Sequence, residues 1–303
     1  MRTGAMSPCC AACVVVEHPD PLSYVSAFEH LLARGRNLLS VAALPPAFPR
    51  VAADAPVCLL LSPHPDDEVI TGGLPLRLRR QDGWRVVNAA VTLGSNPARR
   101  AARWAELTDC CKRLGFDLLS ASGEQVNGLE RISPHTAKRE PGHWAQAVQC
   151  VADLLLQLRP QLVVCPHDND GHVAHLGTHH LVMDALRQVG CEVRPHLLLT
   201  EYWNTQPHPG LMVQLSAQDV ADLVAALSLH AGEVSRNPYH LTLPAGCIDA
   251  VRRGVERVGA PGAGAPGFTF ATLYGWQRWN GSGAEVQDPQ VLPLDASPGR
   301  LFC

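Results

Sequence analysis

The sequence has no run of about 18 apolar residues free of charge, which is the length needed to cross a bilayer as a helix. It also has no excess of positive charge, since the 303 residues carry a formal charge of −3 at pH 7. A nucleic-acid-binding domain is expected to show a basic footprint. No internal repeat and no long charge run of one sign is present. We therefore predict no membrane span and no nucleic-acid partner.

Motifs for two other classes of protein are missing as well. No Gly-x-Gly-x-x-Gly follows the first strand-like run, so a dinucleotide is not implied. Cys10 and Cys13 form a lone Cys-x-x-Cys with no second pair, which is weak evidence for a metal or redox site. Several of the eleven cysteines lie in apolar segments, where free thiols behave as small hydrophobes. Disulfide frameworks belong mainly to small secreted chains, and residues 9–16 are a poor secretory signal, so we predict a cytoplasmic protein.

Strand-like and helical patterns alternate along the chain, which is 46% apolar and can bury a large core. This alternation predicts a mostly parallel sheet in a Rossmann-like three-layer α/β/α sandwich. The predicted strands are residues 57–61, 86–92, 118–121, 162–165 and 195–200, and the predicted helices between them are residues 69–80, 98–114, 144–158 and 176–189.

Composition divides the chain into three predicted parts. Residues 1–54 are an N-terminal extension with one amphipathic helix, at residues 24–43, that ends before Pro45. Residues 55–258 are the main domain. Residues 259–303 begin with a Gly/Pro/Ala-rich linker and end in an aromatic segment. The half-alternating aromatic residues at 268–280 predict an edge strand packed on the same domain.

One imidazole and three carboxylates lie within the five residues His64-Pro65-Asp66-Asp67-Glu68, directly after the apolar run at 57–61. Such groups are costly near a core unless they are paired or bound to a cation. A turn at the end of a strand can aim His64 and Asp67 at one point while Asp66 stays a free carboxylate. This spacing predicts a metal site with a base beside it.

A catalytic zinc site takes about three protein ligands, so a third donor must come from elsewhere in the chain. Residues 168–175 supply metal-type side chains, including His172 and His175, after a second apolar run at 162–166. Ligands in open α/β sheets bind at the carboxyl ends of strands. The two clusters are therefore predicted to meet.

These two clusters resemble the signatures of the PIG-L/LmbE family of metal-dependent N-deacetylases, which are a His-Pro-Asp-Asp-Glu stretch after a strand and a His-x-x-His pair. The resemblance implies an LmbE-like fold and roles for six residues. By this resemblance, zinc would be bound by His64, Asp67 and His175. The general base would be Asp66, and His172 would stabilise or protonate the tetrahedral intermediate. Arg103 would contact the substrate.

Weaker matches extend this resemblance over most of residues 55–240, and some positions depart from it. Arg103 to Glu106 is similar to an Arg-x-x-Glu helix of the family, and His230 lies where a His-x-Ser-Gln segment is expected. The family pattern His-Pro-Asp-His is here His-Val-Ala-His, so a carboxylate is missing at Ala174. The expected Ser-Gln after His230 is Gly232-Glu233. These departures bear on the basicity of His172 and on the substrate range.

The residue types alone support amide hydrolysis. Zinc held by two imidazoles and a carboxylate lowers the pKa of its water to about 7 and polarises a carbonyl, and ferrous iron is compatible with the same ligands. Asp66 would take the proton of the attacking water, and Asp66 or His172 would protonate the departing amine. We therefore predict a zinc-dependent hydrolase that removes an acetyl or other acyl group from the nitrogen of an amino sugar or its conjugate.

Alternatives stay open at this stage. The enzyme could be a metal-dependent amidase for a non-sugar N-acyl compound, or the chain could be a catalytically silent metal-binding or scaffold protein, for which the missing carboxylate at Ala174 argues. The acidic cluster could also be a solvated helix start, and the histidine pair a surface loop. His179, at i+4 from His175, is favoured as an ordinary helix residue over a ligand. The oligomeric state is not specified, and a homo-oligomer remains open.

Overall fold

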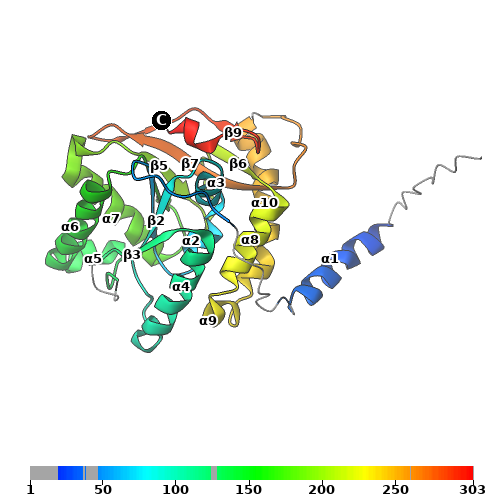
Figure 1. Ribbon diagram of the computed structural model, residues 1–303, viewed down its shortest axis with the longest axis horizontal. Helices are drawn as coiled ribbons and strands as arrows, with labels where there is room; N and C mark the ends of the chain where they lie inside the picture. Colours follow the sequence, from blue (N-terminus) through cyan, green and yellow to red (C-terminus); the bar gives the residue numbers. More distant parts are fainter. Residues whose placement is uncertain (1–19, 37, 39–46, 124–127, 260, 303) are drawn as a thin grey trace, which may run out of the picture. The chain divides into compact units, whose positions relative to one another are not determined.

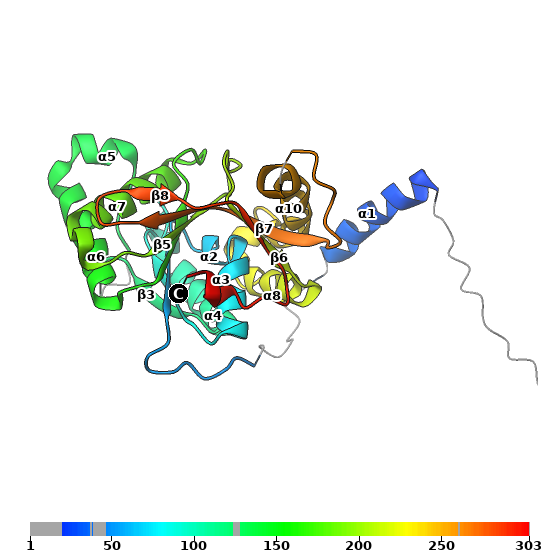
Figure 2. The same ribbon diagram turned by 90° about the horizontal axis from the view of Figure 1, so that it is seen from above.

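The computed structural model in Figures 1 and 2 describes residues 20–36, 38, 47–123, 128–259 and 261–302. The chain divides into two units, residues 1–38 and residues 39–303, and each is described by itself. In the first unit, helix α1 (Pro21–Gly35) begins after Asp20, whose carboxylate accepts hydrogen bonds from two backbone N–H groups. The sequence predicts this helix at residues 24–43, of which 37 and 39–43 lie outside the described residues.

Five parallel strands form the core of the second unit, in the order β3-β2-β1-β4-β5. This arrangement confirms the predicted α/β fold, and each predicted strand is present within about two residues. The strands are β1 (Val57–Ser62), β2 (Arg85–Ala90), β3 (Asp117–Ser120), β4 (Leu162–Pro166) and β5 (His196–Thr200).

Helices cover both faces of the parallel strands (Figure 1). In β1, Cys58 and Leu60 pack toward one face while Leu59 and Leu61 pack toward the other, because side chains alternate along a strand. Helices α3 (Gly73–Gln81), α4 (Arg100–Leu114) and α8 (Ala217–Leu227) cover the first face, and α6 (Pro141–Leu158) and α7 (Val173–Val189) cover the second. The described residues contain no helix with the length and apolar character required to cross a membrane.

The remaining helical elements connect these layers. They are α2 (Asp67–Ile70), η1 (Pro97–Arg99), α5 (Pro134–Arg139), η2 (Gly190–Glu192), α9 (Ala231–Val234), α10 (Tyr239–Gly254), η3 (Val255–Gly259) and η4 (Pro298–Leu301). Of these, α10 is a full helix that packs against the antiparallel part of the sheet, and α2 and α9 each form a single turn close to the functional site.

An extension with antiparallel and parallel pairings widens the sheet beyond β5 (Figure 2). It consists of β6 (Leu211–Leu215), β7 (Phe270–Trp279), β8 (Ala284–Val286) and β9 (Gln290–Leu292). Because β7 lies between β5 and β6 and pairs antiparallel with both, the prediction of an edge strand at 268–280 is wrong. Tyr274 and Trp276 lie on the same face of this strand and are buried there in one core with Leu74 and Leu198.

Strand β7 also holds the segment that follows the acidic cluster. The hydroxyl of Tyr274, which is 1% exposed, donates a hydrogen bond to the carbonyl oxygen of Thr71 at 2.7 Å and accepts one from the N–H of Leu74 at 3.1 Å. These two backbone groups lie at the junction of α2 and α3. A residue close to the end of the chain thus satisfies the backbone beside the candidate site.

Replacing Tyr274 with Phe tests this link. Removing the hydroxyl leaves a buried carbonyl and a buried N–H without their partner, so we expect the free energy of unfolding to fall by about 1–3 kcal/mol. Chemical denaturation measures the change. Val286→Ala, at a side chain that is 77% exposed, is the control and should change the stability by less than about 0.5 kcal/mol. An unchanged midpoint for Tyr274→Phe would show that the hydroxyl does not stabilise the junction.

Candidate functional site

The two polar clusters follow neighbouring strands. Strands β1 and β4 pair in parallel, with Leu60 opposite Val164, so their carboxyl ends lie at the same edge of the sheet. The chain continues from β1 toward β2 on one side and from β4 toward β5 on the other, which makes this the point where the strand order reverses. Ligands bind at such a point in open α/β sheets. The predicted meeting of the clusters is therefore built into the topology.

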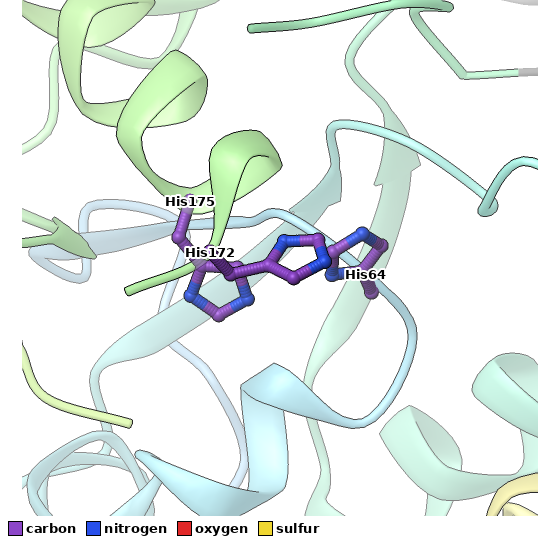
Figure 3. Close-up of side chains that lie close together, drawn as sticks. All are labelled: His64, His172 and His175. Carbon is purple, nitrogen blue, oxygen red and sulfur yellow. The ribbon is translucent and has the colours of Figure 1, made fainter. Parts of the chain in front are cut away.

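Three imidazoles converge at this edge (Figure 3). One ring nitrogen from each of His64, His172 and His175 lies within 4.8 Å of those of the other two. The ring centroid of His64 lies 5.0 Å from that of His172 and 5.4 Å from that of His175. The structure thus brings together histidines that are more than a hundred residues apart in the sequence.

Asp67 lies in the same group. Its Oδ2 is 3.4 Å from Nε2 of His175 and 3.6 Å from Nδ1 of His64, and it accepts a hydrogen bond from the backbone N–H of His64 at 2.8 Å. Burial acts against ionisation of Asp67, but His175 and His64 outweigh it and lower the pKa of this carboxyl. A carboxylate kept ionised between two imidazoles is a suitable cation ligand.

The environment of His175 fits a metal ligand. Among the described residues, its buried Nε2 has no hydrogen-bond partner, while Nδ1 lies 3.4 Å from Oδ2 of Asp170. Metal-bound histidines usually have a carboxylate or carbonyl on the second ring nitrogen, which orients the ring. Asp170 also accepts the backbone N–H of His172 at 3.1 Å. The sequence did not show that Asp170 orients the ring of His175, because a turn separates the two residues and the contact depends on its conformation.

His172 differs from the other two histidines in its surroundings. Its ring stacks on Trp203 at 5.5 Å, and its Nδ1 accepts a hydrogen bond from the backbone N–H of Ala174 at 3.3 Å. Burial lowers the pKa of His172, with further lowering by His64 and His175. A neutral ring whose Nδ1 is an acceptor carries its proton on Nε2. His172 is therefore set up to donate a hydrogen bond.

Asp66 lies at the centre of the turn and has an unusual backbone. Its φ angle is 114°, in a region that non-glycine residues rarely adopt, and its side chain is buried. Burial raises the pKa of this carboxyl, and Asp67 and Glu68 raise it further, although Arg103 acts in the opposite direction. A carboxyl whose pKa is raised is a stronger base than an ordinary aspartate.

Glu68 holds the turn in place. Its Oε2 accepts the backbone N–H of Asp66 at 2.9 Å, and its Oε1 lies 2.7 Å from Nε2 of His230. Both side chains of the Glu68–His230 pair are 0% exposed. The sequence places Glu68 in the acidic cluster, and the structure adds the buried partner that fixes it.

Two further predictions concern single side chains. Nδ1 of His179 donates a hydrogen bond to the backbone oxygen of Pro166 at 2.9 Å, and His179 is not part of the cluster of imidazoles. This agrees with its interpretation as an ordinary helix residue. Arg103 lies close to the predicted base, with Nη2 at 3.3 Å from the carbonyl oxygen of Pro65. It lines the same cleft as His64 and Asp66, which has a volume of about 810 Å³.

Comparison with known sequences identifies the domain that contains this site. Residues 59–186 match the family described as PIG-L: GlcNAc-PI de-N-acetylase. The match covers less than half of the 303 residues, and this part of the chain resembles a PIG-L domain. The predicted resemblance is thereby confirmed, and the matched residues of the PIG-L domain contain His64, Asp66, Asp67, His172 and His175.

Curated relatives extend the match only in part. The chain is 29% identical over 161 residues to the 1D-myo-inositol 2-acetamido-2-deoxy-alpha-D-glucopyranoside deacetylase of Mycobacterium leprae, a match covering 46% of this chain and 52% of the relative. A deacetylase with the same description from Mycolicibacterium gilvum is 27% identical, covering 56% of this chain and 66% of the relative. The chain therefore spans about half to two thirds of the length of these relatives.

Solved structures confirm the fold. The N,N'-diacetylchitobiose deacetylase of Pyrococcus horikoshii matches with a TM-score of 0.53 and 16% identity, covering 86% of this chain and 94% of that protein. The 4-carboxy-2-hydroxymuconate hydratase of Pseudomonas putida KT2440 also gives 0.53, with 17% identity and coverage of 80% and 100%. Because one of these proteins is named a deacetylase and the other a hydratase, the PIG-L fold alone does not fix the reaction.

The backbone of Asp66 leads to a stability prediction. Glycine adopts a positive φ without the steric cost that alanine meets, so we expect Asp66→Gly to be about 1 kcal/mol more stable than Asp66→Ala. At Asp168, an exposed loop residue whose φ is not positive, the order should be reversed. Denaturation of the four chelator-treated variants measures both differences. Equal stability of the two Asp66 variants would show that no backbone strain is stored at this turn.

Proposed function

We propose that this chain is a metal-dependent hydrolase that removes an acetyl or other N-acyl group from an amino sugar or its conjugate. The observation that carries the proposal is the convergence of His64, Asp67, His172 and His175 beside the buried carboxylate of Asp66. All of these residues except His175 line one cleft. The names of the curated relatives, which are deacetylases of a 2-acetamido sugar linked to inositol, support this substrate class.

The proposed metal ligands are His64, Asp67 and His175, with zinc as the proposed ion and ferrous iron as the alternative. The donor set of two imidazoles and one carboxylate suits either ion, and the buried Nε2 of His175 makes no hydrogen bond among the described residues. When bound, such an ion lowers the pKa of a water molecule and polarises an amide carbonyl.

The remaining chemistry belongs to side chains of this protein. Asp66 accepts the proton of the attacking water and passes it to the nitrogen of the departing amine, which is a poor leaving group without protonation. The Nε2–H of His172 donates a hydrogen bond to the carbonyl oxygen as negative charge develops on it. Arg103, which lines the cleft beside Asp66, is the proposed substrate contact.

The backbone of Asp66 favours an enzyme over a catalytically silent scaffold. A non-glycine residue at a φ of 114° costs about 1–3 kcal/mol, and such strain concentrates at functional sites. Asp170 contacts both His172 and His175. It thus supplies a carboxylate to this cluster, which position 174 does not do because it is an alanine.

We propose in addition that the protein acts in the cytoplasm and that the domain boundaries lie near residues 54 and 258.

Metal content and amine release test the proposed function together. The purified protein should hold about one zinc per chain and release free amine from N-acetylglucosamine conjugates, and His64→Ala should lose both properties. Asp66→Asn should keep the metal but lose about 10²–10⁴-fold in kcat, because only the proton acceptor is removed. Asp168→Asn, in an exposed loop of the same cluster, is the control.

Each outcome has a distinct meaning for the proposal. Loss of the metal in Asp66→Asn would make Asp66 a ligand instead of a base. Full activity of the same variant would remove it from the mechanism. Metal-replete protein that cleaves other N-acyl amides but no amino-sugar conjugate would favour the non-sugar amidase.

A further inference from the structure

One wall of the cleft is built from three arginines around a single buried glutamate. Glu233, whose side chain is 5% exposed, receives Nη1 of Arg99 at 3.1 Å, Nη2 of Arg236 at 2.7 Å and Nη2 of Arg103 at 3.5 Å. We call these four residues the arginine wall. Burial raises the pKa of Glu233, but its three arginine partners outweigh this and lower it, so the carboxylate is ionised at neutral pH. The wall therefore carries three positive charges and one negative charge.

The backbone is shaped to admit these guanidinium groups. A Cβ atom on Gly232 would overlap Nη2 of Arg99, and a Cβ atom on Gly94 would overlap Nη1 of Arg103. Gly94 also has a φ of 84°, which favours glycine. Two of the three arginines thus reach Glu233 through space that only a glycine leaves free.

This arrangement explains a departure noted in the sequence. In the family pattern His-x-Ser-Gln, the histidine corresponds to His230, and this chain has Gly232-Glu233 in place of Ser-Gln. The glycine makes room for Arg99, and the glutamate supplies the charge that gathers Arg99 and Arg236. The two departures from the family pattern, Gly232 and Glu233, therefore both contribute to the arginine wall.

The wall lines the same cleft as the reacting groups and has N–H groups that are free to bind a ligand. Arg99, Arg236 and Arg103 line the cleft that also contains His64 and Asp66. The side chains of Arg99 and Arg236 are 36% and 63% exposed. Within the described part of the chain, the Arg99 side chain donates one hydrogen bond, whereas a guanidinium has five N–H groups.

Other charges in the cleft do not cancel this excess. Arg100 pairs with Glu130, and Arg131 pairs with Glu140, so these two arginines are balanced by their own partners. The carboxylates of Asp66 and Asp67 belong to the site already described, where a divalent cation would offset them. The positive charge of the wall is thus available to a ligand.

We propose that the arginine wall binds an anionic group of the substrate, so that this enzyme acts on N-acyl amino sugars whose conjugated part carries a phosphate or a carboxylate. Arginine binds both groups through paired N–H donors, and bonds between charged partners are the strongest of their kind. Arg99 and Arg236 are specificity-determining residues, and Gly232 and Glu233 position them. This inference rests on the proposed function for its substrate.

Selectivity between matched substrates tests the proposal. N-acetylglucosamine 1-phosphate and carboxymethyl N-acetylglucosaminide should each exceed the neutral methyl N-acetylglucosaminide in kcat/KM by at least about tenfold. Arg99→Gln and Arg236→Gln should each reduce this ratio by about tenfold, mainly through KM. The phosphate and carboxylate substrates show which of the two anions the wall prefers.

Two further variants separate recognition from folding. Gly232→Ala displaces only the flexible end of Arg99, so it should lower the anion preference while the thermal midpoint stays the same. Arg187→Gln is the matched control, because Arg187 is 60% exposed and pairs with an acidic residue three positions earlier, as Arg236 does, but lies outside the cleft lining. It should leave the ratio unchanged.

Binding without turnover distinguishes a failure of this inference from a failure of the proposed function. Calorimetric titration with glucosamine 1-phosphate and with methyl glucosaminide should show tighter binding of the anion, reduced in Arg236→Gln. Any affinity of the metal for the anion is common to all variants and cancels in this comparison. Equal kcat/KM for anionic and neutral substrates, or equal binding of both amines in the absence of turnover, would overturn the inference. Anion binding without any deacetylation would support the wall and contradict the proposed function.

Discussion

The buried pair of Glu68 and His230 holds the functional region together. Glu68 uses one carboxylate oxygen for the imidazole of His230 and the other for the backbone N–H of Asp66. A buried carboxylate is tolerated only when its oxygens are satisfied, so this glutamate ties two distant segments at a fixed distance. One segment is the turn after β1, with the candidate base and two candidate ligands. The other leads into α9, with Gly232 and Glu233. The reacting groups and the charged wall of the cleft are therefore oriented by the same interaction.

Much of the parallel sheet and of the imidazole cluster could be predicted from local sequence. Runs such as residues 57–61 are apolar without alternation because both faces of a central parallel strand are buried. The His-Pro-Asp-Asp-Glu stretch and the His-x-x-His pair follow such runs, and parallel neighbours place their ends together. Chemistry that depends on position at the end of a strand is thus readable from the chain alone.

The unpredicted features all depend on pairing between distant segments. The aromatic residues of β7 alternate only in part, because side chains on both faces of this strand are buried, and no local pattern records that β5 and β6 pair with it. Likewise, Arg99 and Arg236 resemble solvated helix residues until Glu233 is placed between them. The fold is shared with proteins named for different reactions, so these side chains, and not the sheet, decide what the protein does.

The position of β7 has a consequence for the order in which the protein is made. Tyr274 closes hydrogen bonds at the junction that follows the acidic turn, and β7 fills the gap between β5 and β6. During synthesis from the N-terminus, all the candidate ligands leave the ribosome about a hundred residues before this strand. Until it arrives, β5 and β6 present unpaired edges that favour association with other chains. The nascent protein thus passes through a stage in which its chemical groups are complete but its sheet is open.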